Sequence, residues 1–145
     1  MGLDMYLKKR IFIGGEYEHR KVSGTVKLKI CNKRIILKPT EISEIISRVG
    51  HWYKANAIHK WFVDNVQDGV DECQESHVSF DQLEELKRLC EQVLATKNPL
   101  LLPPQAGFFF GSLEIDEYYW KNLEETIAII SKLEPDKEYF YQSSW

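Results

Sequence analysis

The residues best suited to catalysis are thiols and imidazoles, because thiols can act as nucleophiles and imidazoles can exchange protons near pH 7. The candidates are Cys31, Cys73, Cys90, His51, His59 and His77. The sequence contains neither a G-x-S-x-G nucleophile elbow nor a G-x-x-x-x-G-K-[ST] phosphate loop. Cys90 falls on the apolar stripe of an expected helix, where a thiol usually packs without reacting. The sequence therefore indicates no catalytic residue and favours a protein that is not an enzyme.

The acidic segment 64–75 carries part of the ligand pattern of a calcium-binding loop. The residues that fit the pattern are Asp64, Asp68, Gly69, Glu72 and Glu75. However, Val66 stands where a side-chain ligand is required, and Asp71 stands where the pattern is apolar. Cys73 and His77 have the spacing of zinc ligands, but a second close Cys/His pair is missing. We therefore predict no metal ion and no cofactor.

Composition and charge are those of an ordinary globular protein. The 145 residues are 43% hydrophobic and 28% charged, and the net charge is −3. This charge argues against general affinity for nucleic acid or anionic membranes, although segment 21–38 is basic and leaves a phosphate-binding strand face as an alternative. No apolar run could span a membrane, residues 1–7 do not resemble a signal peptide, and three widely spaced cysteines suit a reducing compartment. We expect a cytoplasmic protein that binds neither nucleic acid nor membrane.

The most distinctive stretch is HWYKANAIHKWFVDNVQD, residues 51–68. Apolar residues recur in it at helical spacings of three and four: Trp52, Ala55, Ile58, Phe62 and Val66. Trp61 widens the apolar arc, so we expect a helix that is buried on two sides. Its polar residues have two interpretations. Asn56, His59 and Lys60 either belong to a solvated face or project into a cleft.

The first part of the chain has the alternating pattern of β-strands. Strands are expected at residues 2–13, 22–30 and 35–37, and the last two are expected to form a hairpin that turns at Asn32-Lys33. Thr40 has the chemistry of a helix N-cap, and the isoleucines that follow it predict a short helix ending at Gly50.

Helix signals dominate the second part. Ser79 and Gln82 have the spacing of a capping box, which predicts a helix that runs to Lys97. Asp116 is placed to cap a last helix. Residues 100–111, LLLPPQAGFFFG, suggest a short buried strand, and residues 138–141 suggest an edge strand or a tail. These elements predict a single α+β domain over residues 1–145, with an antiparallel sheet of three to five strands packed by about four helices.

Aromatic and acidic side chains gather between residues 108 and 120. The rings are Phe108, Phe109, Phe110, Tyr118, Tyr119 and Trp120, and the acids are Glu114, Asp116 and Glu117. Rings that face outward would form a protein-binding patch, because Tyr and Trp are favoured at such surfaces. Rings that face inward would belong to the core. The sequence leaves both arrangements open.

Three stretches, MGLDMYL, KANAIHKWFVDNVQDG and QAGFFFGS followed by DEYYW, together resemble a family of small uncharacterised proteins of phages, prophages and bacterial genomes, a family without an established activity. The resemblance covers most of the chain and is most specific at residues 52–69 and 104–120. It implies a phage-associated intracellular context and no particular reaction. It also suggests that Asp4, Asn56, His59, Lys60 and residues 107–112 form one surface.

Two functions follow as hypotheses. The first is a non-enzymatic, phage-associated accessory protein that binds an unidentified protein partner through its rings, or pairs as a homodimer. The second is a small ligand-binding protein or enzyme with a cleft between the aromatic helix and the Gly107–Gly111 segment, in which His59 would serve as acid or base. The expected ligand-binding or interaction residues are Asp4, Asn56, His59, Lys60, Phe108, Phe110, Ser112, Tyr118 and Trp120.

Overall fold

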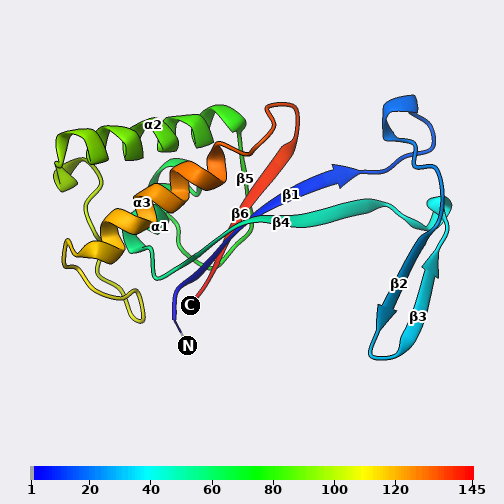
Figure 1. Ribbon diagram of the computed structural model, residues 1–145, viewed down its shortest axis with the longest axis horizontal. Coiled ribbons are helices and arrows are strands. Elements are labelled where there is room, and N and C mark those ends of the chain that lie inside the picture. Colours follow the sequence, from blue (N-terminus) through cyan, green and yellow to red (C-terminus); the bar gives the residue numbers. More distant parts are fainter. Residues whose placement is uncertain (1) are drawn as a thin grey trace. The chain divides into compact units, whose positions relative to one another are not determined.

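The computed structural model describes residues 2–145 and has the α+β architecture expected from the sequence (Figure 1). Met1, the first residue of the MGLDMYL stretch, lies outside the described residues. The strands are β1 (Asp4–Phe12), β2 (Val26–Ile30), β3 (Lys33–Leu37), β4 (Glu44–Tyr53), β5 (Ser76–Val78) and β6 (Glu138–Ser144). The α-helices are α1 (Asn56–Val66), α2 (Phe80–Thr96) and α3 (Glu117–Ile130). The single domain stays a prediction, because the chain divides into two compact units, Met1–Lys9 with Arg48–Trp145, and Arg10–Ser47.

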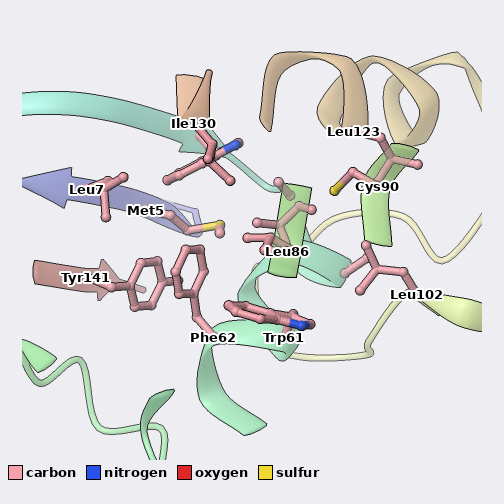
Figure 2. Packing of buried hydrophobic residues seen from close by; sticks show 14 of the residues in the cluster. Met5, Leu7, Trp61, Phe62, Leu86, Cys90, Leu102, Leu123, Ile130 and Tyr141 are labelled. Atoms are coloured by element: carbon pink, nitrogen blue, oxygen red, sulfur yellow. The ribbon is translucent and has the colours of Figure 1, made fainter. Parts of the chain in front are cut away.

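The larger unit is built on an antiparallel sheet with the strand order β4-β1-β6-β5. Along the β1 segment, Leu3, Met5 and Leu7 are fully buried, whereas Asp4 and Tyr6 between them are partly exposed. This alternation is that of a sheet with one covered face. The three helices supply the cover, because their buried residues join those of the sheet in one hydrophobic cluster (Figure 2).

Stacked aromatic rings form the centre of this cluster (Figure 2). The ring of Phe62 on α1 lies 3.9 Å from that of Tyr141 on β6, with an angle of 6° between the ring planes. Trp61 meets Phe62 edge to face at 5.3 Å. Trp52 is also buried, and its Nε1 donates to the Thr126 hydroxyl at 2.9 Å. The aromatic stretch thus anchors the core, because large rings bury the most apolar area.

Two of the three helix caps predicted from the sequence, those at Ser79 and Asp116, are confirmed. At the start of α2 the Ser79 hydroxyl accepts from the N–H of Gln82 at 3.1 Å, and the Gln82 side chain accepts from the N–H of Ser79 at 3.0 Å. At the start of α3 one carboxylate oxygen of Asp116 accepts from the N–H groups of Tyr118 and Tyr119. These side chains satisfy N–H groups that have no partner within the helix.

The smaller unit contains the predicted hairpin, formed by β2 and β3. Val26 pairs with Leu37 and Ile30 with Lys33, so the connecting turn has two residues. Both of them, Cys31 and Asn32, have positive φ values, 47° and 65°. This conformation is that of the tight turns whose twist matches a hairpin. The turn therefore lies one residue earlier than the sequence suggested.

The short helix expected over residues 40–50 is wrong. Glu44–Tyr53 form the strand β4, and the segment before it makes only a single 3-10 turn, Pro39–Glu41. Ile45 and Ile46 fit a helical spacing, but β-branched side chains are better suited to strands. Pairing with the β1 segment decides the outcome, since the N–H of Lys54 donates to the Leu3 carbonyl at 2.8 Å.

Three further expectations need correction. The aromatic helix begins at Asn56 and not at residue 51, so the described residues contain three α-helices and not four. Segment 100–111 forms no strand, and Pro99–Leu101 makes a 3-10 turn within it. The last strand is not an edge strand, because β6 lies between β1 and β5. No helix within residues 2–145 is long and apolar enough to cross a membrane.

Candidate functional site

A pocket of about 360 Å³ opens in the larger unit at the N-terminal ends of α1 and α3. The segment between β4 and α1 forms one wall, and the segment leading into α3 forms the other. The lining residues are Tyr53, Lys54, Ala55, Asn56, Ala57, Ile58, Pro104, Gly111, Ser112, Glu114, Asp116, Tyr118, Tyr119, Asn122 and Leu123. The sequence suggested a cleft between the aromatic helix and the Gly107–Gly111 segment. Of the binding residues expected on that helix only Asn56 lines this pocket, and of that segment only Gly111 does.

Asn56 holds the two walls together. Its Nδ2 donates to the carbonyls of Phe110 and Ser112 at 3.1 and 2.9 Å, and its Oδ1 accepts from the N–H of Gln105 at 3.1 Å. The side chain is 5% exposed, and three hydrogen bonds use most of its donor and acceptor capacity. Asn56 is therefore a structural tie for segment 105–112, with little capacity left to bind a ligand.

Two residues in the first turn of α1, Ala57 and Ile58, line this pocket. The N-cap position is occupied by Ala55, which cannot accept a hydrogen bond through its side chain. No hydrogen bond within the described residues uses the N–H groups of Ala57 and Ile58, which both line the pocket. Such groups carry the positive end of the helix dipole and favour an anion. Lys54 lines the same end of the pocket.

The backbone of Gly111 packs closely against the side chain of Lys54, and both residues have positive φ values. Lys54 has a φ of 53° and Gly111 a φ of 93°, both in the left-handed region. A Cβ at Gly111 would lie 3.2 Å from the Cβ of Lys54. Glycine thus serves two needs here, a positive φ and a close approach of the chain to the Lys54 stem.

The opposite wall carries carboxylates and phenols. Asp116 is committed to capping α3, whereas Glu114 is exposed. The Tyr119 hydroxyl donates to the Leu102 carbonyl at 2.8 Å. Burial, followed by the charge of nearby Cys90, raises the pKa of Tyr119 to about 12. Tyr119 therefore stays protonated near neutral pH and contributes a wall, not a base.

Exposed apolar side chains follow one another in the segment that forms the second wall. The side chain of Phe108 is 79% exposed and that of Tyr118 65%. The other exposed apolar residues of this segment are Phe109, Leu113 and Ile115. We call the five residues the apolar rim. Phe110 differs, because its side chain is 5% exposed and meets the His59 ring edge to face at 5.1 Å. Of three consecutive phenylalanines, one is core and two are surface.

His59 lies in a buried hydrogen-bond chain and does not line the pocket. Its Nδ1 is 2.7 Å from the Tyr141 hydroxyl, and its Nε2 is 2.9 Å from Oδ2 of Asp71. The other Asp71 oxygen accepts from Nε1 of Trp145 at 3.0 Å. In the neutral imidazole with its proton on Nε2, Nε2 donates to Asp71 and Nδ1 accepts from the Tyr141 hydroxyl. The acid–base role expected for His59 lacks a route to a ligand, because its side chain is fully buried.

Three other residues that the sequence placed in the site lie away from this pocket. Oδ1 of Asp4 lies within hydrogen-bond distance, 3.0 Å, of Nε2 of the exposed His51 on the neighbouring strand β4. Lys60 pairs with Asp64 one turn along α1. Trp120 is partly buried, and the Lys97 ammonium lies 4.6 Å from its ring centroid. None of these predicted residues, Asp4, Lys60 and Trp120, lines the pocket, whereas Asn56, Ser112 and Tyr118 do.

Sequence reasoning missed the residues that contribute through their backbone. In the sequence Ala57 and Ile58 are ordinary apolar positions. Their N–H groups are available to a ligand because the side chain of Ala55, at the N-cap, cannot accept a hydrogen bond. An apolar residue before a helix start was the one available signal. Asn122 also lines the pocket, from the second turn of α3, and nothing in its spacing marked it out.

Within residues 2–145, no group of three or more His, Cys, Asp and Glu side chains is placed to hold a metal ion. Comparisons of the chain with protein-family models, with curated proteins and with solved structures gave no match. The function must therefore be argued from the pocket and its surroundings.

Proposed function

We propose that this protein binds a small molecule with one anionic group and an apolar or aromatic body, in the pocket at the N-terminal ends of α1 and α3. The observation that carries the proposal is the pocket itself. Its volume of about 360 Å³ falls within the range of small-molecule sites, roughly 300–1,000 Å³. Its lining combines apolar and aromatic side chains with a few polar groups, which is typical of such sites.

The charges around the pocket favour a ligand with a single anionic end. The free N–H groups of Ala57 and Ile58, with Lys54 beside them, favour a carboxylate or a similar anion at the α1 end. Glu114 on the other wall disfavours a second negative charge and suits a hydroxyl or an ammonium group. Tyr118 and Tyr119 would contact the body of the ligand. No thiol or imidazole lines the pocket, which supports binding over a reaction.

The test is a titration of the isotope-labelled protein with phenylacetate and, separately, with the uncharged analogue phenylacetamide. NMR measures the chemical shifts of the backbone amide resonances at each ligand concentration. We expect phenylacetate to shift the Ala57 and Ile58 amide resonances saturably, because its carboxylate would accept from both N–H groups. Phenylacetamide should bind at least several-fold more weakly. The proposal fails if phenylacetate and a larger analogue, indole-3-acetate, both leave these two resonances unmoved.

A pair of variants separates pocket binding from surface binding. Asn122→Trp places an indole in the pocket from its α3 wall and should abolish the phenylacetate shifts. Glu124→Trp adds the same side chain at an exposed position of α3 that does not line the pocket, and it should leave them intact. Equal effects of the two variants would contradict the pocket as the site.

A second candidate function is a phage-associated accessory protein that binds another protein through the apolar rim. The favouring observation is the exposure of Phe108, Leu113 and Tyr118 in one segment, since contiguous exposed apolar residues mark interaction surfaces. Three free cysteines, Cys31, Cys73 and Cys90, support a cytoplasmic setting for either function. Phe108→Ser should abolish complex formation in this case, whereas it should leave phenylacetate binding in the pocket largely unchanged.

A further inference from the structure

The β2–β3 hairpin is a two-stranded ribbon with cations on one of its faces (Figure 1). Residues directly opposite in an antiparallel pair point to the same face, whereas neighbours along a strand point to opposite faces. The register pairs Lys29 with Arg34 and Lys27 with Ile36, so these four residues share one face. All four are exposed. We call this surface the basic face.

The three cations of the basic face are not neutralised by other side chains. Within residues 2–145 none of them forms an ion pair, whereas Lys21 of the same unit is paired with Glu18. Lys29 and Arg34 stand directly opposite each other, and like charges in this position destabilise a strand pair. An anion that lies over the basic face would relieve this repulsion.

The net charge of −3 for the whole chain hides this surface. The unit Arg10–Ser47 contains eight Lys and Arg against four Glu, a net charge of +4, whereas the rest of the chain contains eleven against eighteen acids, a net charge of −7. Salt screens exposed charges beyond about 8 Å at physiological ionic strength, so the local charge of a surface decides what it attracts. The expectation that the chain does not bind nucleic acid rested on the total charge and does not describe the basic face.

We propose that the basic face binds duplex DNA, with the two-stranded ribbon in the major groove. This groove has the width to admit a β-ribbon. Lys27, Lys29 and Arg34 would contact phosphate oxygens and the acceptor edge of guanine, which lysine and arginine are suited to bind. Ile36, the one apolar residue of this face, would lie against thymine methyl groups. The proposal goes beyond the proposed function and needs no ligand in the pocket.

Duplex DNA suits the basic face better than other nucleic acids do. Proteins that bind single strands stack the bases on aromatic rings, and residues 26–37 contain no aromatic side chain. The major groove of duplex RNA is deep and narrow, and side chains cannot read it. The exposed apolar residues Leu28, Ile30 and Ile35 point to the opposite face of the hairpin and take no part in the contact.

The test measures the binding of a fluorescently labelled short duplex DNA of mixed sequence by fluorescence anisotropy, at a series of salt concentrations. The native protein should bind with a dissociation constant of roughly 10⁻⁴–10⁻⁶ M at physiological salt, which is typical of contacts to phosphates. Each phosphate contact contributes about −0.9 to the slope of log K against log salt concentration, so three contacts predict a slope of roughly −2.7.

The variant with Lys27→Gln, Lys29→Gln and Arg34→Gln removes the three cations but keeps side chains of similar length. Its affinity should fall by about tenfold or more, and most of the salt dependence should disappear with the phosphate contacts. Lys27→Arg with Lys29→Arg keeps the charge and should keep both the affinity and the slope. Circular dichroism establishes that each variant is folded.

The matched control carries Arg88→Gln, Lys121→Gln and Lys132→Gln. It makes the same three replacements at exposed positions of the larger unit, so the net charge of the chain changes equally. This variant should bind the duplex nearly as the native protein does. Single-stranded DNA of the same length should bind the native protein several-fold more weakly than the duplex.

Four outcomes would overturn the proposal. The first is a native protein that leaves the anisotropy of the duplex unchanged even at low salt. The second is a control variant that loses as much affinity as the hairpin variant, and the third is single-stranded DNA that binds as tightly as the duplex. The fourth is binding to phosphatidylserine vesicles but not to the duplex, which would make an anionic membrane the partner. The phenylacetate titration still reports independently on the pocket.

Discussion

The hydroxyl of Tyr141 lies 2.7 Å from Nδ1 of His59, and both side chains are fully buried. The histidine in turn contacts Asp71 at 2.9 Å, so the hydrogen-bond chain connects the core of the sheet to the loop that follows α1. Buried polar groups of this kind contribute to a unique core only while every member is satisfied.

Tyr141→Phe tests this chain. The substitution leaves Nδ1 of His59 without its partner, and an unsatisfied buried acceptor costs about 1–3 kcal/mol. The free energy of unfolding, measured by urea denaturation, should fall by this amount. Tyr118→Phe is the control, since the Tyr118 side chain is 65% exposed and its variant should unfold like the native protein. Equal stabilities of the two variants would show that the buried hydrogen bond contributes nothing.

Two buried phenols predict a loss of stability at alkaline pH. Burial raises the pKa of Tyr119 from 10.0 to about 12 and raises that of Tyr141 well above 10.0. The folded state therefore holds protons that the unfolded state releases, and stability falls as the pH rises from about 10 toward 12. Urea denaturation at a series of pH values should show this fall. In Tyr119→Phe the fall should be shallower, and an unchanged slope would contradict the assignment.

Asn56→Asp should release the segment that covers the start of α1. Aspartate keeps the size but replaces the two N–H donors to the Phe110 and Ser112 carbonyls with an acceptor. We expect a loss of roughly 2–4 kcal/mol, together with faster amide hydrogen exchange in residues 105–112. Asn122→Asp is the control, because no hydrogen bond of its side chain within residues 2–145 is lost. Unchanged exchange in Asn56→Asp would show that the segment is held by other contacts.

Gly107→Ala should displace the buried ring of Phe110. A Cβ at Gly107 would lie 2.2 Å from Cδ2 of that ring, which is far inside van der Waals contact. Because overpacking typically costs about 1–3 kcal/mol, the midpoint of thermal unfolding should fall by several degrees. Gly15→Ala provides the comparison, since an added Cβ there has no neighbour within 4 Å. A variant at residue 107 as stable as the one at residue 15 would contradict the packing described for Phe110.

Cys90 and Cys31 should differ in reactivity toward iodoacetamide. Burial, with the nearby charge of Glu91, raises the pKa of Cys90 to about 12, so the reactive thiolate is scarce near neutral pH. Cys31 is exposed in the hairpin turn. Mass spectrometry should find Cys31 alkylated in the native protein and Cys90 alkylated only after unfolding. Rapid alkylation of Cys90 in the folded state would show that its helix opens readily.

Local signals in the sequence determined much of the fold. The capping box at Ser79 and the cap at Asp116 fix where α2 and α3 begin, because their hydrogen bonds span only three residues. The alternation of apolar and polar residues predicted β1 and the hairpin, because this pattern is also local in the sequence. Ile45 and Ile46 of β4 fit the spacing of a helix, and pairing with β1 selected the strand.

The pocket, by contrast, could be predicted only as a location. The sequence indicated Asn56 and the 107–112 segment together, and the structure joins them by hydrogen bonds. It could not indicate that Asn56 is used in hydrogen bonds to segment 105–112, that His59 is fully buried, or that Ala57 and Ile58 line the pocket. These depend on contacts between residues about fifty or more positions apart.

Sequence by itself thus determined the α+β class, the caps, the hairpin and the aromatic core, because those features follow from the chemistry of neighbouring residues. Tertiary structure alone decided which of three consecutive phenylalanines is buried and which polar side chains reach a cavity. The physical reason is that burial is a property of the assembled chain. The rings of Phe108 and Phe110 are chemically identical, and only the position of His59 and Trp145 around Phe110 makes one of them core.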